Sequence, residues 1–126
     1  MATERGAQIA VASRPEALRD VLLAAFDAVV LVSTTGDFLD DEAQHALQHF
    51  VRSGGGVVAI HGAADAEYDR PWYGEMLGAV FARHSPVEAG VVEVAPGPLA
   101  GDLPARFEHA DEWYEHRAPP PSDATV

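Results

Sequence analysis

The sequence contains no cysteine and no lysine. Without cysteine, disulfide bonds, thiolate metal sites and a cysteine nucleophile are excluded, and the absence fits a cytoplasmic protein. All eight basic residues are therefore arginines, against 20 acidic residues, and the net charge is −12. Such a surface repels nucleic acids and anionic membranes, so we expect neither as a partner.

Long apolar runs are also absent. No stretch approaches the roughly 20 residues of a membrane-spanning helix, and residues 1–8 lack the apolar segment of a signal peptide. The chain has 126 residues, of which 48% are hydrophobic, and this is enough for one globular domain. We expect residues 1–117 to form that domain and residues 118–126 (APPPSDATV) to be a proline-rich tail.

Apolar runs and helical patterns alternate along the chain. Strands are predicted at residues 8–12, 28–32, 57–60 and 90–94, with an extended segment at 107–114. Three helices are predicted between them: one after a capping box at residues 13–16, one capped by Asp40, and one that opens at Pro71 and continues through Phe81. This order predicts an α/β domain with a mostly parallel sheet. Residues 28–32 are continuously apolar, as in a strand covered on both faces.

Two loops follow consecutive predicted strands, at residues 33–37 and 61–69. Ligands of parallel sheets bind outside the carboxyl ends of the strands. We therefore expect these two loops to converge on one cleft.

The stretch at residues 54–65 (GGGVVAIHGAAD) carries the strongest candidate, His61. It reads as a helix stop, a buried strand and a tight turn. In many α/β enzymes such an elbow holds a Ser or Cys nucleophile, so an imidazole here indicates acid/base or metal chemistry. Alternatively, the ring nitrogens of His61 only form hydrogen bonds with the backbone of the turn. The small residues 62–64 leave the ring accessible and favour a function.

Two further residues are weaker candidates when taken alone. Asp65 can orient His61 or bind a polar substrate, and it can equally cap a short turn. His84, in the segment 81–86 (FARHSP), follows the third predicted helix. A histidine at a helix end usually makes only a favourable contact with the helix dipole, although Pro86 would help to aim a ligand.

Acidic and aromatic residues near the end of the chain suggest a sugar or metal site. In an extended segment, Glu112 and Tyr114 of the sequence DEWY share one face. Beside a histidine they can bind sugar hydroxyls or complete a metal site; the alternative is an ordinary acidic strand.

Trp72 lies beside the apolar stripe of the third helix and can overhang the cleft as a platform for a sugar ring, whereas Tyr73 lies on the stripe and is expected in the core.

Two other patterns carry no function. His45 and His49 have the spacing of a helical zinc pair, but they lie opposite the apolar stripe of their helix and are expected in solvent. The glycines form no phosphate-binding motif.

Five segments in series resemble the ThuA-like (trehalose utilisation) family. They are residues 34–42 (TTGDFLDDE), 54–65, 71–73 (PWY), 81–84 (FARH) and 111–114 (DEWY). Their order and spacing match as well, and the resemblance covers residues 4–117. It implies a flavodoxin-like, three-layer α/β sandwich of the class I glutamine amidotransferase-like superfamily.

The resemblance also implies a role in the metabolism of trehalose and related sugars. His61 stands where amidotransferases carry their cysteine, so glutaminase activity is not expected. We expect a saccharide or an oxidised sugar as the small-molecule partner. The site residues that we predict are His61, Asp65 and Glu112 as catalytic groups, and Asp37, Trp72 and Tyr114 as substrate contacts. A His/His/carboxylate set suits zinc or a similar divalent ion, so His61, His84 and Glu112 are hypothetical metal ligands.

The chain departs from the family pattern at both ends. Family members usually begin with a strand and a Gly-Phe-Arg-His-like segment, and they continue into a later strand and a Gly-His segment; neither is found here. We therefore expect a chain truncated at both ends, a misassigned start, or a protomer whose sheet a second copy completes. Loss of a central strand should expose apolar edges at residues 8–12 or 28–32. The alternative functions are a non-catalytic sugar-binding or assembly module and an inactive fragment.

Overall fold

The computed structural model describes residues 6–19, 23–97, 100–122 and 124. The chain divides into two compact units, Met1–Glu67 and Tyr68–Val126, which we call unit 1 and unit 2 and describe separately.

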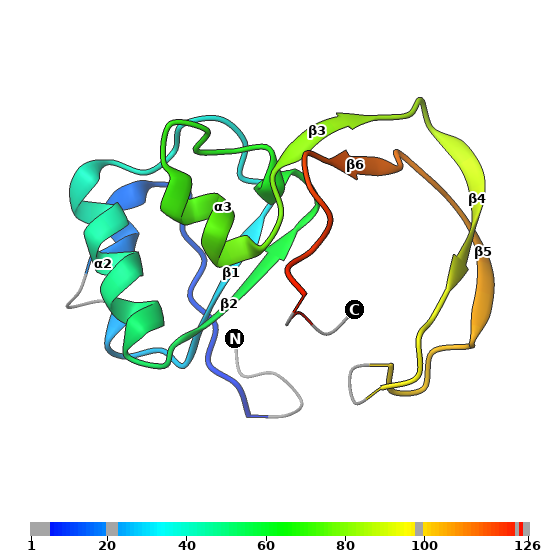
Figure 1. Ribbon diagram of the computed structural model, residues 1–126. Helices are drawn as coiled ribbons and strands as arrows, with labels where there is room; N and C mark the ends of the chain where they lie inside the picture. The colour runs from blue at the N-terminus through cyan, green and yellow to red at the C-terminus, as the bar shows by residue number, and fades with distance from the viewer. Residues whose placement is uncertain (1–5, 20–22, 98–99, 123, 125–126) are drawn as a thin grey trace. The chain divides into compact units, whose positions relative to one another are not determined.

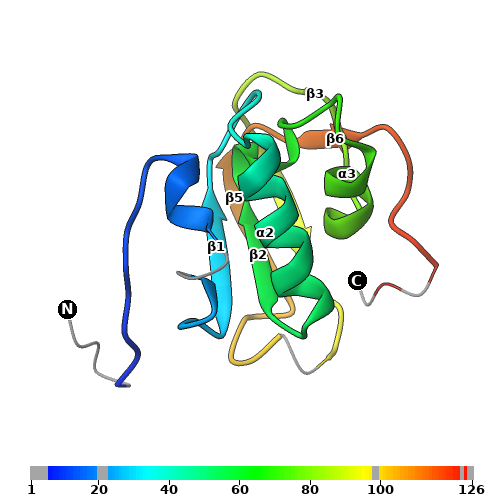
Figure 2. The same cartoon turned by 90° about the vertical axis from the view of Figure 1, so that its left-hand side faces the viewer.

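Unit 1 is built around two parallel strands and the helix that connects them (Figure 1). Its elements are the short 3₁₀ helix η1 (Pro15–Leu18), strand β1 (Ala28–Val32), helix α2 (Asp41–Arg52), strand β2 (Gly56–Ile60) and the 3₁₀ helix η2 (His61–Ala64). The two strands pair in parallel from Ala28↔Gly56 to Val32↔Ile60. Figure 2 shows α2 lying in front of this pair. The predicted strands at 28–32 and 57–60 and the helix between them are thus confirmed.

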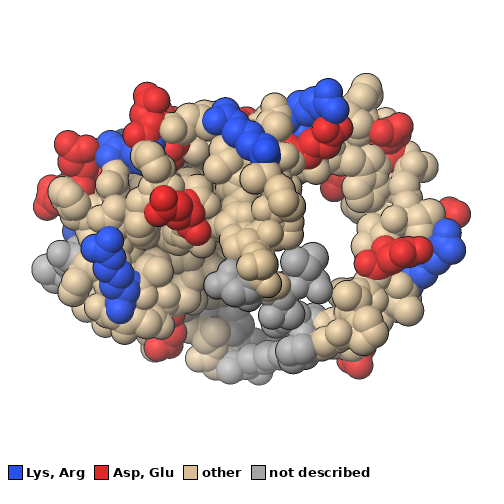
Figure 3. All heavy atoms as spheres, in the orientation of Figure 1, with Lys and Arg blue, Asp and Glu red and all other residues tan. Residues whose placement is uncertain are grey.

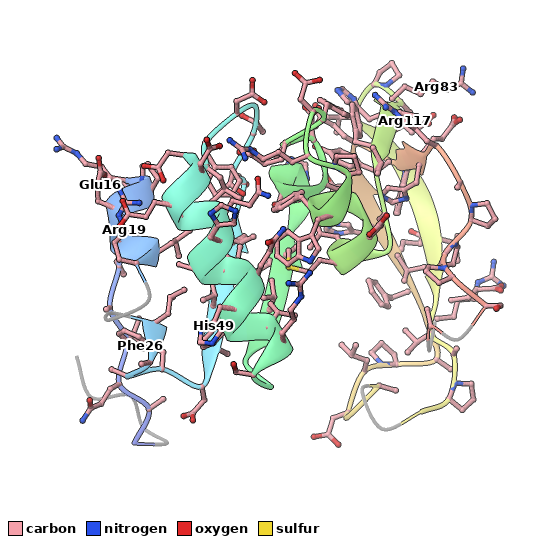
Figure 4. The ribbon with its side chains drawn as sticks, turned by 60° about the vertical axis from the view of Figure 1, so that its left-hand side comes forward. Glu16, Arg19, Phe26, His49, Arg83 and Arg117 are labelled. Carbon is pink, nitrogen blue, oxygen red and sulfur yellow. The ribbon has the colours of Figure 1, made fainter. Side chains whose placement is uncertain are left out.

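Helix α2 forms where its cap and apolar stripe predict it. The Asp40 carboxylate accepts a hydrogen bond from Ala43 N at 2.7 Å, and it also pairs with the guanidinium of Arg19, the residue labelled in Figure 4. The hydrogen bond from Ala43 is the main reason that the pKa of Asp40 is lowered, and Arg19 adds to the effect. The buried side chains of α2 are those of the stripe: Ala43, Ala46, Leu47 and Phe50. His45 and His49 are exposed, as expected.

The β1–β2 pair is covered on one face only. Leu31 is 4% exposed, whereas its neighbours Val30 and Val32 are 55% and 61% exposed. Their cross-strand partners Val58 and Ile60 are also exposed. The prediction of a strand buried on both faces is therefore wrong for β1. Alternating side chains point to opposite faces, and only one of these faces is packed.

The segment before β1 differs from its prediction. Residues 9–12 form no strand, and Gln8 makes only an isolated bridge. Ile9 and Val11 of this segment are exposed. The capping box at 13–16 does not form either, because the N-cap of η1 is Arg14 and no side chain caps it. The later part of this predicted helix, residues 20–22, lies outside the described residues.

Unit 2 consists of one helix and two antiparallel strand pairs. Helix α3 (Pro71–Leu77) is followed by strands β3 (Phe81–His84), β4 (Glu88–Glu93), β5 (Arg106–Asp111) and β6 (Tyr114–His116). Strand β3 pairs with β6, and β4 pairs with β5. The predicted strand at 90–94 and the extended segment at 107–114 are confirmed. The mostly parallel sheet is not, since two of the three pairs among the described residues are antiparallel.

The third helix is shorter than predicted. Gly78 adopts a left-handed conformation with φ 68°, and its N–H bonds to the carbonyls of Gly74 and Glu75. This is the usual way in which glycine terminates a helix. Phe81 and His84 consequently lie in a strand, and the prediction that His84 follows a helix end is wrong.

The molecule is thus a mixed α/β structure with small sheets. On the face drawn in Figure 3, both units carry acidic side chains, interspersed with arginines. Within the described part of the chain, no helix is both long and apolar enough to cross a membrane.

Candidate functional site

His61 lies at the carboxyl end of β2, in an unusual backbone conformation. Its φ is 53°, a left-handed backbone value that residues other than glycine rarely adopt. Ser33, at the corresponding end of β1, also has a positive φ of 49°, and its N–H donates to Ile60 O at 3.1 Å. Both strands therefore end in a sharp elbow, and the His61 side chain is exposed at one of them.

The small residue after His61 allows the two elbows to approach each other. A Cβ atom on Gly62 would lie 2.8 Å from Thr35 Cγ2 and 3.5 Å from Ser33 Cα. The first distance is shorter than any ordinary carbon–carbon contact. Gly62 is thus needed for close packing of the loops, and not only for access to the imidazole.

The two predicted loops approach each other at this edge of the sheet, whereas a cleft between them stays a prediction. Gly36 N donates to Asp65 O at 3.0 Å, and Glu67 N donates to Gly36 O at 3.2 Å. Asp65 ends η2, and its N–H donates to Gly62 O. Asp65 is therefore the C-cap of this turn and not its N-cap. Thr34 Oγ1, in the same loop, is buried, and no described residue provides it with a hydrogen bond.

Glu67 joins the loops most firmly, and sequence reasoning missed it. The residue is 2% exposed, and its Oε1 accepts hydrogen bonds from Phe38 N at 2.6 Å and Leu39 N at 2.7 Å. A buried carboxylate that accepts two backbone N–H groups makes strong, charge-assisted bonds. We call this arrangement the Glu67 clamp. No local pattern marks the residue, because its partners lie almost 30 positions earlier in the chain.

In unit 2, the β3–β6 pair brings three of the predicted site residues together. His84 is paired with Tyr114 in the strand register, and their rings stack with centroids 5.7 Å apart. The Nδ1 atom of His84 lies 3.9 Å from Glu112 Oε1 and 2.8 Å from the carbonyl oxygen of Ser85. The expected grouping of a histidine with a carboxylate and a phenol is therefore present.

A reciprocal contact between Ser85 and Trp113 holds this group in place. Ser85 N donates to Trp113 O, and Trp113 N donates to Ser85 Oγ, both at 3.2 Å. The Trp113 indole lies against Gly90, where a Cβ atom would come within 2.4 Å of the ring, and its Nε1 donates to Glu88 O. The sequence did not single out Ser85 or Trp113 as site residues. The alternation of side chains in DEWY indicated only that Trp113 lies on the opposite face from Glu112.

The remaining predicted site residues are less closely defined. Trp72 is half-buried at the start of α3, and Tyr73 is 1% exposed, so the prediction that Tyr73 belongs to the core is confirmed. Asp37 is exposed in the loop after β1. The roles assigned to Asp37, Trp72 and Tyr114 in substrate binding stay predictions.

The donor sets do not support the zinc hypothesis. Among the residues that the structure describes, no three His, Asp or Glu side chains gather as a metal-binding group. Glu112 also approaches Nδ1 of His84, the nitrogen that contacts Ser85, so the two side chains are not arranged as neighbouring ligands of one ion. Convergence of His61 with His84 and Glu112 stays a prediction, and the function proposed below uses no metal ion.

A shallow hollow of about 270 Å³ lies elsewhere in unit 2. The end of α3 and the proline-rich segment line it, and Pro121 Cδ would be 3.2 Å from a Cβ atom on Gly78. None of the predicted site residues lines this hollow.

Comparison with known proteins identifies the family. No curated protein and no solved structure matches the chain. The family model ThuA, described as trehalose utilisation, matches residues 1–126, which is the whole chain. This agrees with the five motifs and with the histidine elbow at the end of β2. The chain therefore belongs to the ThuA trehalose-utilisation family.

Proposed function

We propose that this protein acts on a saccharide or an oxidised sugar through a histidine-centred site, without glutaminase activity. The observation that carries the proposal is the left-handed backbone of His61 at the end of a parallel strand. Strained conformations of this kind cost about 1–3 kcal/mol and cluster at functional sites. We also propose a flavodoxin-like, three-layer sandwich as the fold, because the motifs resemble a superfamily with that architecture.

The chemistry follows from the residue at the elbow. The chain has no cysteine, so an acyl-thiolate mechanism is excluded. An exposed imidazole can accept or donate a proton near neutral pH, which suits reactions at sugar hydroxyl or carbonyl groups. In unit 1, we assign Asp65 to orient His61. In unit 2, we assign His84 and Glu112 to proton transfer and hydrogen bonding with sugar hydroxyls.

Turnover of trehalose, glucose and their oxidised derivatives by the purified chain tests the proposal. His61→Ala should lower turnover by about a hundredfold or more, because general acid–base groups contribute at least that much. His45→Ala is the matched control, since His45 is an exposed histidine of the same unit. Ammonia release from glutamine should be absent in all variants. Equal sugar turnover by His61→Ala and the unaltered chain would refute the proposal.

His61→Gly separates chemistry from backbone strain. Glycine adopts a positive φ without the Cβ clash, so this variant should be more stable than His61→Ala by about 1 kcal/mol. It should be no more active, because both variants lack the imidazole. Recovery of sugar turnover in His61→Gly would show that the elbow, and not the imidazole, is what the reaction needs.

One observation favours a second candidate, an assembly module in which a second copy of the chain covers the open face of the sheet. Val30, Val32, Val58 and Ile60 form four exposed apolar positions on one face of β1–β2. Light scattering should then show a dimer that Val58→Asp converts to a monomer. A monomer at all concentrations would exclude this candidate and leave the enzymatic proposal intact.

A further inference from the structure

The imidazole of His84 has its two nitrogens in different environments. Nδ1 lies 2.8 Å from the Ser85 carbonyl oxygen, with Glu112 Oε1 at 3.9 Å from the same nitrogen. A carbonyl oxygen only accepts hydrogen bonds, so the hydrogen of this contact must be on Nδ1. A neutral imidazole carries one ring hydrogen, and the other nitrogen, Nε2, therefore presents a lone pair. The described residues provide no hydrogen-bond partner for Nε2.

We infer that His84 meets its substrate through Nε2, as the acceptor for a sugar hydroxyl, and that Ser85 and Glu112 are positioning residues for this nitrogen. The inference rests on the proposed function for the class of substrate. The assignment of the nitrogen rests only on the contacts of Nδ1. The His84 side chain is 42% exposed, so a small polar molecule can reach it.

The surroundings of His84 hold the ring in this orientation. Its face stacks on Tyr114, with an interplanar angle of 21°, and Phe81 lies on the same strand with its ring centroid 5.9 Å away. The reciprocal hydrogen bonds between Ser85 and Trp113 fix the carbonyl that selects the tautomer and the segment that carries Glu112. Ring rotation and tautomer exchange would each break one of these contacts.

The same contacts favour proton transfer to Nε2. When a sugar hydroxyl gives up its proton, the proton moves to Nε2, the sugar oxygen keeps the electron pair, and the ring becomes an imidazolium. The positive ring still donates from Nδ1 to Ser85 O, and the Glu112 carboxylate stabilises its charge. A carboxylate beside the catalytic histidine has this role in serine proteases.

His109 provides a matched comparison within unit 2. It is also exposed and also lies near a carboxylate, but the contact is made by Nε2, which is 3.4 Å from Asp111 Oδ2. The two histidines thus have similar partners at opposite ring nitrogens. A measurement that reports each nitrogen separately should tell them apart.

Nitrogen-15 NMR of the full chain, without any sugar, tests the tautomer directly. At a pH where the rings are neutral, His84 should show a protonated Nδ1 and an unprotonated Nε2, and His109 should not share this pattern. Glu112→Gln should leave the tautomer of His84 unchanged, because the Ser85 carbonyl is still present. A His84 ring with its hydrogen on Nε2 would overturn the inference, whether or not the protein turns over a sugar.

Amide substitutions test which nitrogen the sugar uses. In His84→Gln the side-chain amide reaches the position of Nε2, whereas in His84→Asn it reaches only the position of Nδ1. Sugar binding should therefore stay within about threefold in the Gln variant and weaken about tenfold in the Asn variant, which is the value of one hydrogen bond. Glu112→Gln should lower kcat and leave KM unchanged, because it acts on the charged ring. Better binding by the Asn variant than by the Gln variant would contradict the assignment.

Discussion

The two units hold their candidate histidines by different means. Of the ten buried apolar side chains among the described residues, nine belong to unit 1 and only Tyr73 to unit 2. His61 is fixed by its backbone, at the end of a strand whose loop is closed by the Glu67 clamp. His84 is fixed by side-chain contacts on an exposed strand pair. Backbone conformation and a buried polar clamp therefore position the first histidine, and exposed polar and aromatic contacts position the second.

The largest effect is expected from the Glu67 clamp. Glu67→Ala leaves the buried amide of Leu39 and the part-buried amide of Phe38 without their acceptor, at a cost of about 3 kcal/mol in the free energy of unfolding. Hydrogen exchange should show these two amides unprotected, and circular dichroism should show a lower free energy of unfolding. Glu112→Ala in unit 2 is the comparison; it should cost about 0.5 kcal/mol or less, because Glu112 is 35% exposed. If Glu67→Ala and Glu112→Ala lower the free energy of unfolding equally, the two units do not differ in how firmly their carboxylates are held.

Unit 2 should be most sensitive at Gly90. A Cβ atom there would lie 2.4 Å from the Trp113 ring, so Gly90→Ala should displace the indole and cost about 2 kcal/mol. The displacement should also disturb Ser85 and hence His84, which NMR can follow. Gly97→Ala is the control, because no atom lies within 4 Å of its Cβ position. An unchanged Trp113 fluorescence in Gly90→Ala would contradict the prediction.

In unit 1, Gly62→Ala should lower the free energy of unfolding by about 1 kcal/mol, which is less than the cost of Gly90→Ala. The new methyl group meets the end of the exposed Thr35 side chain, 2.8 Å from Cγ2, which can move. Thr35→Ser removes this methyl group and should restore most of the lost stability in the double variant. If the double variant is as unstable as Gly62→Ala alone, the contact with Thr35 is not the cause.

The smallest effect is expected from the pH dependence of the Asp40 cap. Because the hydrogen bond from Ala43 and then Arg19 lower the pKa of this carboxyl in the folded chain, its contribution is fully present above its ordinary pKa of 3.8. It is lost as the pH falls through the lower, folded value. The melting temperature of the unaltered chain should exceed that of Asp40→Asn at pH 6, and the gap should close as the pH falls below about 4. A gap that persists at pH 2 would show that the cap does not depend on the charge.

Local sequence signals predicted the elements whose determinants lie close together in the chain. Asp40 and the stripe of α2 lie within one helix, and the apolar runs of β1 and β2 are continuous. The end of α3 could also have been predicted, because glycine commonly terminates helices and Gly78 does so here. The helical spacing of apolar residues through Phe81 instead predicted a longer helix. The failed strand at 8–12 shows the opposite case. An apolar run becomes a strand only when a partner supplies its hydrogen bonds.

The sequence by itself determined that a histidine stands at the end of an apolar strand, that the chain has no cysteine nucleophile, and which family the motifs resemble. Tertiary structure alone decided that Glu67 holds the two loops of unit 1 together and that the Ser85 carbonyl selects the tautomer of His84. The physical reason is the range of the interactions. A cap or an apolar stripe is set by neighbours a few residues away, whereas a hydrogen bond between distant segments forms only after the backbone has brought them together.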